Sequence, residues 1–299
     1  MALVDIPTST LYFSRRFLVS PNPGSAGPPK SLPATTLIGT PGMKSLSGTI
    51  VCITGASSGI GMACAREFAR HGAQLLLAAR RKDRLEILAA ELKREHKTGS
   101  FIVQLDVRNQ PAVETIFNAL PQQWQAIEIL VNNAGLSRGF DKLHEGSIQD
   151  WEEMIDTNVK GLLYVSRSVI PGMVARKKGT IINIGSVAGH DVYLRGNVYC
   201  ATKFAVDALT KGMRMDLLDT PVRVCTVDPG LVETEFSIVR FRGDESRAKT
   251  VYQNLQPLTP EDIADAVVFC ATRPPHVQVA EIVVMPTAQA SPMMVHRTT

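Results

Sequence analysis

The chain has 299 residues, of which 44% are hydrophobic and 20% are charged. This profile is typical of a globular protein with one large domain or two small ones. No apolar run approaches the roughly 18–20 residues that cross a bilayer, so we expect no integral membrane segment. The formal net charge of +4 is spread along the chain without a dense basic block, which argues against nucleic acid as a partner.

Residues 1–43 differ in composition from the rest of the chain. They are rich in Ser, Thr, Pro and Gly, their only acidic residue is Asp5, and Arg15 and Arg16 interrupt an apolar stretch. We interpret this segment either as an organellar transit peptide, which would direct the chain to a mitochondrion or plastid, or as a disordered extension of a cytoplasmic protein. Met43 is also a candidate internal start.

From residue 44 onward, strand patterns alternate with helix patterns. Helical periodicity covers Asp83–Glu95 and Asp150–Ala175, Pro111 fits the first turn of a helix, and Thr259 and Pro260 form a helix start. The expected strands are β-branched, apolar runs at Thr49–Thr54, Ala73–Ala79, Ser100–Val107, Ile127–Ala134, Thr180–Ser186, Val222–Asp228 and Glu281–Pro286. The alternation predicts an α/β fold over residues 44–299. It would be a single-domain, Rossmann-type, doubly wound parallel sheet of about seven strands with helices on both faces.

The cysteines indicate packing rather than chemistry. No C-x-x-C pair is present, so we expect neither a metal site nor dithiol redox chemistry. We interpret all five as buried free thiols in a reducing compartment: Cys52, Cys64, Cys200, Cys225 and Cys270.

A glycine-rich turn follows the first predicted strand directly. Gly55 permits a tight turn, Gly59 lets the backbone approach a pyrophosphate, and Gly61 lets the next helix pack against the strand. The start of that helix would face the phosphates. At the first strand–helix junction of an alternating α/β chain, this pattern predicts a dinucleotide site.

The glycine spacing resembles that of the short-chain dehydrogenase/reductase family. Further motifs match in order: Asn132-Asn133-Ala134-Gly135, Asn158, Ser186, Tyr199-x-x-x-Lys203 and Pro229-Gly230. The resemblance covers about residues 47–290. It implies a cofactor site made of Gly55, Ser57, Ser58, Gly59, Ile60, Gly61, Asp106, Val107, Asn133, Ala134, Gly135, Tyr199, Lys203, Pro229, Gly230, Val232 and Thr234. It also implies a homo-oligomer, either a dimer or a tetramer.

The end of the second predicted strand selects the dinucleotide. An acidic residue there would bind the ribose 2′-hydroxyl of NAD, but this chain has Ala79, followed by Arg80 and Arg81. A guanidinium can hold a phosphate in bidentate fashion. We therefore predict NADP as the cofactor.

Tyr199 and Lys203 are four residues apart, and thus on one face of a helix. The positive charge of Lys203 would favour the tyrosinate, so that Tyr199 can exchange a proton with an alcohol or a carbonyl near neutral pH. Ser186 would hydrogen-bond the substrate oxygen. The family resemblance adds Asn158, which supports a water that links Lys203 to solvent.

The C-terminal third is similar to one subgroup of the family, the NADP-dependent 3-hydroxy acid dehydrogenases acting on serine, L-allo-threonine and 3-hydroxypropionate. The similarity lies in Asn197–Lys203, Asp228–Ser237, Val239–Asp244 and Leu258–Asp262. One departure is Arg195, which stands where the subgroup has small residues. We expect Arg240, Arg242 or Arg195 to hold the carboxylate of a small-molecule substrate. Three other readings remain open: a carbonyl reductase for a larger apolar alcohol such as a steroid or isoprenoid, a 3-oxoacyl carrier-protein reductase, and a dinucleotide-binding protein without turnover.

Overall fold

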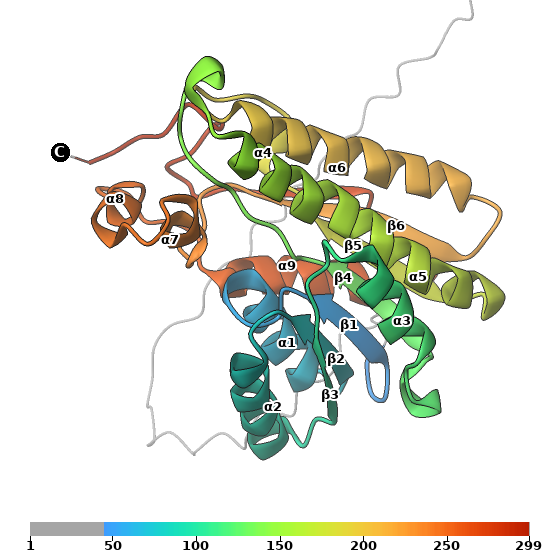
Figure 1. The fold of residues 1–299 in the computed structure, drawn as a ribbon. Coiled ribbons are helices and arrows are strands. Elements are labelled where there is room, and N and C mark those ends of the chain that lie inside the picture. Colours follow the sequence, from blue (N-terminus) through green and yellow to red (C-terminus); the bar gives the residue numbers. More distant parts are fainter. Residues whose placement is uncertain (1–44, 299) are drawn as a thin grey trace, which may run out of the picture. The chain divides into compact units, whose positions relative to one another are not determined.

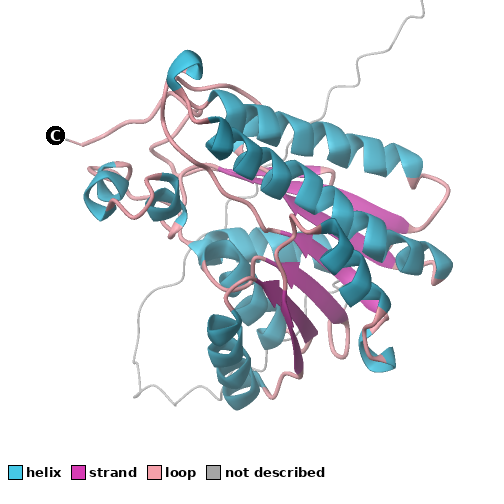
Figure 2. Ribbon diagram, viewed as in Figure 1, coloured by secondary structure: helices cyan, strands magenta, loops and turns pink. Residues whose placement is uncertain are grey.

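The computed structural model describes residues 45–298, and these lie within one compact unit. The predictions for residues 1–43 fall outside the described residues. Seven parallel strands form one sheet in the order β3-β2-β1-β4-β5-β6-β7. Their bounds are β1 Ile50–Thr54, β2 Gln74–Ala79, β3 Ser100–Gln104, β4 Ile127–Asn132, β5 Gly179–Ile184, β6 Val222–Pro229 and β7 Glu281–Val284. The predicted doubly wound α/β fold is confirmed (Figures 1 and 2).

Helices cover both faces of the sheet because the strands are apolar on both sides. One face packs against α1 (Gly59–Arg70), α2 (Lys82–His96) and α9 (Pro260–Thr272). The other face packs against α3 (Gln110–Asn118), α5 (Leu162–Ala175) and α6 (Asn197–Asp216), which lie together in Figure 1. Within the described residues, no helix is both long and apolar enough to cross a membrane.

Several local predictions are confirmed. Thr259 caps α9 in a reciprocal capping box with Asp262, and Pro260 occupies the first turn. Pro111 lies in the first turn of α3. All five cysteines are free and buried.

One helical prediction needs correction, and one helical segment was not predicted. The pattern over Asp150–Ala175 predicted helix throughout, but α4 (Ile148–Ile155) and α5 are separated by a π-helical turn at Asp156–Gly161. Hydrophobic periodicity does not register one inserted residue per turn, so the sequence gives no sign of it. Residues 231–252, for which no helix was predicted, contain two short helices, α7 (Phe236–Arg240) and α8 (Glu245–Thr250).

The order of strands places the site. The direction in which successive strands are added to the sheet reverses between β1 and β4, and in open α/β sheets ligands bind beyond the carboxyl ends of the strands at this point. The glycine turn, the ends of β4, β5 and β6, and helix α7 meet at that edge.

Candidate active site

The turn after β1 and the first turn of α1 each have a position that accepts only glycine. Gly55 has a φ of +68°, and a Cβ on it would lie 2.9 Å from the Ala134 Cα. A Cβ on Gly61 would collide with the Asn133 amide and lie 2.5 Å from the Gly55 carbonyl oxygen. The first strand, the turn and α1 therefore approach the end of β4 so closely that no side chain fits between them.

Hydrogen bonds join the ends of β1 and β4. The Asn133 side-chain amide donates to the Thr54 carbonyl at 2.9 Å and to the Gly55 carbonyl at 3.2 Å. The Thr54 hydroxyl accepts the backbone N–H groups of Asn133 and Ala134 at 3.1 and 3.0 Å. Sequence reasoning missed Thr54, whose role depends on a strand that lies distant in the chain.

Arginine side chains lie at the end of β2. Arg81 donates to the Ser57 hydroxyl at 3.2 Å, to the Ser58 hydroxyl at 2.6 Å and to Glu235 at 2.9 Å. The strand itself ends at Ala79, without an acidic residue. This corner therefore offers a cation and two hydroxyl groups beside the glycine turn, which suits a phosphate.

Tyr199, Lys203 and Ser186 converge between α6 and the end of β5. The Lys203 ammonium donates to the Ile184 carbonyl at 2.9 Å and lies 5.8 Å from the centre of the Tyr199 ring. The Ser186 backbone N–H donates to Asp228 at 3.1 Å, which fixes the loop that carries the Ser186 hydroxyl. All three side chains are at least nine-tenths buried.

Burial shifts the titration of this pair in opposite directions. Burial raises the pKa of Tyr199 well above its usual range, and the nearby Tyr193 adds to the rise, while Arg240 and a hydrogen bond with Ser186 oppose it. Burial lowers the pKa of Lys203 to about 8, against the opposing charge of Asp228. A further positive charge beside Tyr199 would be needed to stabilise the tyrosinate at neutral pH.

Asn158 lies in the π-helical turn and is only 2% exposed. Its side chain accepts the Leu136 N–H at 2.8 Å, donates to the Leu136 carbonyl at 2.8 Å and donates to the Thr202 hydroxyl at 3.0 Å. The extra residue of a π turn changes the direction of a side chain, and such turns recur at functional sites. Asn158 thus links the loop after β4 to α6, the helix that carries Tyr199 and Lys203.

Of the three candidate arginines, Arg240 lies deepest in the site. Its guanidinium carbon is 5.4 Å from the centre of the Tyr199 ring and 5.1 Å from that of Phe236, and its Nη2 donates to the Tyr193 hydroxyl at 2.9 Å. Its Nε is buried without a hydrogen-bond partner among the described residues. Arg195 is exposed at the rim, whereas Arg242 pairs with Asp150.

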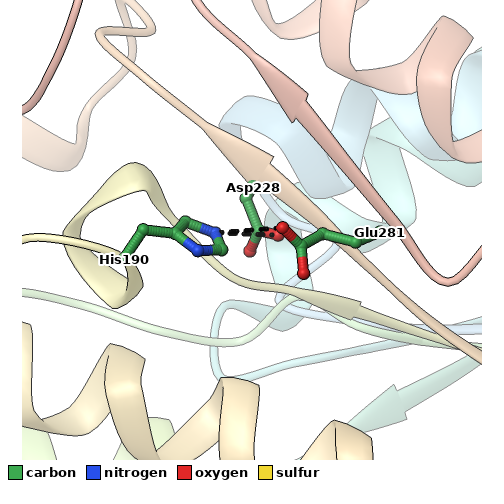
Figure 3. A group of neighbouring side chains, drawn as sticks. All are labelled: His190, Asp228 and Glu281. Atoms are coloured by element: carbon green, nitrogen blue, oxygen red, sulfur yellow. Dashed lines mark ion pairs between the residues drawn. The ribbon is translucent and has the colours of Figure 1, made fainter. Parts of the chain in front are cut away.

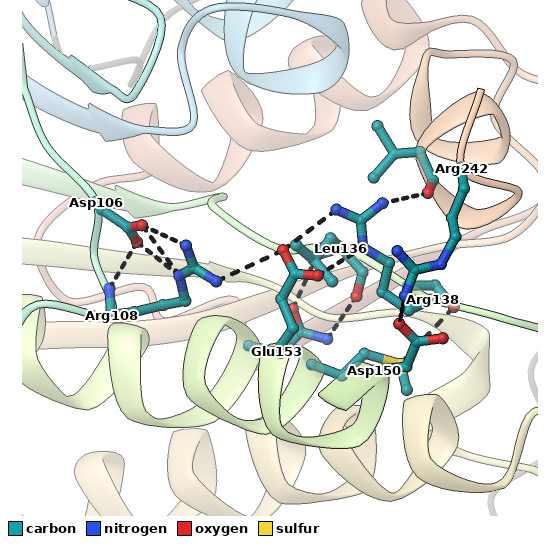
Figure 4. Close-up of polar contacts among 11 residues, drawn as sticks. Asp106, Arg108, Leu136, Arg138, Asp150, Glu153 and Arg242 are labelled. Carbon is teal, nitrogen blue, oxygen red and sulfur yellow. Dashed lines mark hydrogen bonds and ion pairs between the residues drawn. The ribbon is translucent and has the colours of Figure 1, made fainter. Parts of the chain in front are cut away.

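Backbone and ionic contacts hold α7 over the site (Figure 4). Arg138 donates to the Val239 carbonyl at 2.5 Å and pairs with Glu153 at 2.7 Å, and the Gly139 N–H donates to the Arg240 carbonyl at 3.1 Å. The same Glu153 also contacts Arg108, which pairs with Asp106. A chain of charged side chains thus connects the end of β3 with α7.

A second cluster contains His190, Glu281 and Asp228, the residue that accepts the Ser186 backbone N–H (Figure 3). His190 Nε2 is 3.3 Å from Asp228 Oδ2 and 3.7 Å from Glu281 Oε1. The three side chains could also hold a metal ion, so the expectation of no metal site stays a prediction. Sequence reasoning missed this cluster because the three residues come from a loop, β6 and β7.

One cavity of about 820 Å³ connects the glycine turn, the end of β2, the Tyr199 site and α7. Nearly all of the predicted site residues line it, including Gly55, Arg81, Ser186, Tyr199 and Arg240. The predicted residues that do not line it are Gly61, Asn158 and Arg242. Gly61 and Asn158 instead pack directly behind its wall.

Comparisons with known proteins agree with this geometry. The family model described as short chain dehydrogenase matches residues 49–244. An NADP-dependent 3-hydroxy acid dehydrogenase of Salmonella typhi is 48% identical over 250 residues, which are 83% of this chain and 99% of that protein. One of Schizosaccharomyces pombe is 43% identical over 256 residues, covering 85% and 99%. The closed form of a serine dehydrogenase complexed with NADP+ superposes with a TM-score of 0.78 at 48% identity, over 84% of this chain and 100% of that one.

Proposed function

Because the chain belongs to the short-chain dehydrogenase family, we propose that it is an NADP-dependent 3-hydroxy acid dehydrogenase. It would interconvert a small 3-hydroxy acid, of the serine, L-allo-threonine or 3-hydroxypropionate type, and its oxo form. The observation that carries this proposal is Arg240, whose guanidinium lies over the ring of Tyr199 and whose Nε is buried without a hydrogen-bond partner among the described residues. The relatives named for this activity support it over nearly their whole length.

The chain's own residues fit NADP. Gly55 and Gly59 line the cavity, where the backbone of the glycine turn is open to a pyrophosphate, and Arg81 with Ser57 and Ser58 forms a corner for a 2′-phosphate. Asp106 and Val107 line the cavity where the adenine would lie. When bound, NADP supplies the acceptor or donor of hydride. We expect NADP to exceed NAD by at least about tenfold in kcat/KM, a gap of about 1.4 kcal/mol; equal use of both would refute the assignment.

Proton transfer is the task of Tyr199. Its hydroxyl would take the proton of the substrate alcohol in oxidation and return it in reduction. The charge of Lys203, together with that of the oxidised nicotinamide, would counter the burial that raises the pKa of Tyr199. Ser186 would hold the substrate oxygen, and Asn158 would position a water that connects Lys203 to solvent.

Arg240 would hold the substrate carboxylate. Arg240 lies on α7, the short helix that covers the cavity, and its guanidinium is beside Tyr199. Its Nε–H is a hydrogen-bond donor without a partner among the described residues. A charge-assisted pair in a site screened from water is stronger than one at the surface. Arg195 at the rim is the second candidate, and Arg242 is already paired with Asp150.

The experiment compares 3-hydroxypropionate with its methyl ester. Wild type should prefer the acid by at least about tenfold in kcat/KM, and Arg240→Met should remove most of that preference. Arg195→Met tests the second candidate for the carboxylate in the same way. An enzyme with equal kcat/KM for the ester and the acid makes no use of the carboxylate. The assignment would then move to the carbonyl reductases.

We also propose that the protein is a homodimer or homotetramer that acts in the cytoplasm, unless residues 1–43 direct it to a mitochondrion or plastid. Exposed apolar side chains on α5 and α6 support self-association: Leu163 is 38% exposed, Phe204 41% and Met215 77%. Light scattering coupled to gel filtration measures the state directly, and a monomer at micromolar concentration would contradict it.

A further inference from the structure

Glu235 occupies the corner that suits a 2′-phosphate. One carboxylate oxygen accepts from Arg81 at 2.9 Å and the other from Arg84 at 2.6 Å. The same Arg81 guanidinium reaches the hydroxyl groups of Ser57 and Ser58 in the glycine turn. An anion of this chain is therefore already bound by the cation that we assign to the cofactor.

The position of Glu235 in the chain connects the two ends of the site. It immediately precedes α7, and the next residue, Phe236, packs edge-on against the Tyr199 ring at 5.5 Å between ring centres. Arg240, above the same ring, ends this single helix. Only four residues thus lie between a side chain at the phosphate corner and the arginine at the substrate end.

Resting on the proposed use of NADP, we propose that Glu235 is a cofactor-specificity residue, whose carboxylate binds Arg81 in the free enzyme and is displaced by the 2′-phosphate. A guanidinium has a limited set of donors, and a phosphate monoester with three oxygens and nearly two negative charges competes well for them. The Glu235 carboxylate and the 2′-phosphate are both negatively charged and repel each other, so they do not bind Arg81 at the same time.

The displacement distinguishes the two dinucleotides. NAD brings no anion to this corner, so Glu235 stays on Arg81 and α7 keeps its anchor there. NADP releases Glu235, and the start of α7 is free to adjust over the nicotinamide end of the cavity. Glu235 thereby reduces the affinity for NADP and, in return, couples the 2′-phosphate to the position of α7.

The test measures binding by calorimetry with 2′,5′-ADP and 5′-AMP, which differ only in the 2′-phosphate. Glu235→Gln should bind 2′,5′-ADP and NADP at least about fivefold more tightly than wild type, a change of about 1 kcal/mol. Its affinity for 5′-AMP should stay within about twofold. Glu233→Gln removes the same charge from an exposed side chain two residues away and should behave as wild type.

The opposite result is equally clear. If Glu235→Gln binds 2′,5′-ADP as wild type does, or more weakly, Glu235 does not compete with the phosphate and the inference is wrong. If the wild type binds neither 2′,5′-ADP nor NADP, the proposed cofactor itself is wrong. Binding of 5′-AMP shows that each variant is folded.

A second measurement needs no variant. Amide hydrogen exchange of residues 236–240 in the wild type should differ between saturating NADP and saturating NAD, because only NADP displaces Glu235. Identical exchange in the two complexes would overturn the coupling between the phosphate corner and α7.

Discussion

Replacing Lys203 with methionine should change how the stability of the protein depends on pH. Burial lowers the pKa of Lys203 from 10.5 to about 8, so the folded protein holds this charge at a cost of about 3 kcal/mol at neutral pH. The cost is fully present below pH 8 and disappears above pH 10.5, because the unfolded chain binds the proton more tightly in that window.

Urea unfolding at pH 7 and pH 10 measures this effect. Relative to Lys203→Met, the wild type should gain about 2–3 kcal/mol in the free energy of unfolding between the two pH values. Lys211→Met is the control, because Lys211 lies on the same helix but is exposed and paired with Asp207. A difference between wild type and Lys203→Met that stays constant with pH would show that Lys203 carries no such cost.

Three further predictions concern the support of the site. Gly61→Ala should lower the free energy of unfolding by about 1–3 kcal/mol in urea denaturation and weaken NADP binding, because the added Cβ would meet the Asn133 amide. An unchanged free energy of unfolding and unchanged NADP affinity would refute the close approach of α1 to the end of β4. Asp228→Asn should lower kcat by about tenfold with little change in KM, since an amide cannot accept from both Ser186 and Thr226; kcat equal to wild type would contradict this. The thiol reagent DTNB should label none of the five cysteines in the native protein and all five in guanidinium chloride, and rapid native labelling would mean that the core opens easily.

The sequence predicted the sheet and most of the cofactor groove. Long apolar strands leave a strong periodic signal, and the glycine turn follows the first of them without interruption. Gly55, Ser186, Tyr199 and Lys203 were identified because each lies at a fixed place in a local motif, and the fold brings the ends of β1, β5 and β6 to one edge.

Contacts between segments that are distant in the chain could not be predicted from the sequence. The π-helical turn at Asn158 adds a residue without changing the apolar pattern, so nothing in the sequence marks it. The pairing of Glu235 with Arg81 spans more than 150 residues, and it depends on where the segment after β6 crosses the glycine turn. For the same reason, the sequence did not distinguish Arg240 from Arg242. In the structure, Arg240 lies over the Tyr199 ring, whereas Arg242 pairs with Asp150.

The most direct test of the proposed function follows absorbance of reduced cofactor during oxidation of L-allo-threonine or 3-hydroxypropionate with NADP. Wild type should form one NADPH for each oxo product, whereas Tyr199→Phe should retain NADP binding and lose at least about 100-fold in kcat, because only the proton-transferring hydroxyl is removed. The assignment would be contradicted if the wild type formed no NADPH with any small 3-hydroxy acid. It would also be contradicted if Tyr199→Phe kept more than about a tenth of the wild-type activity.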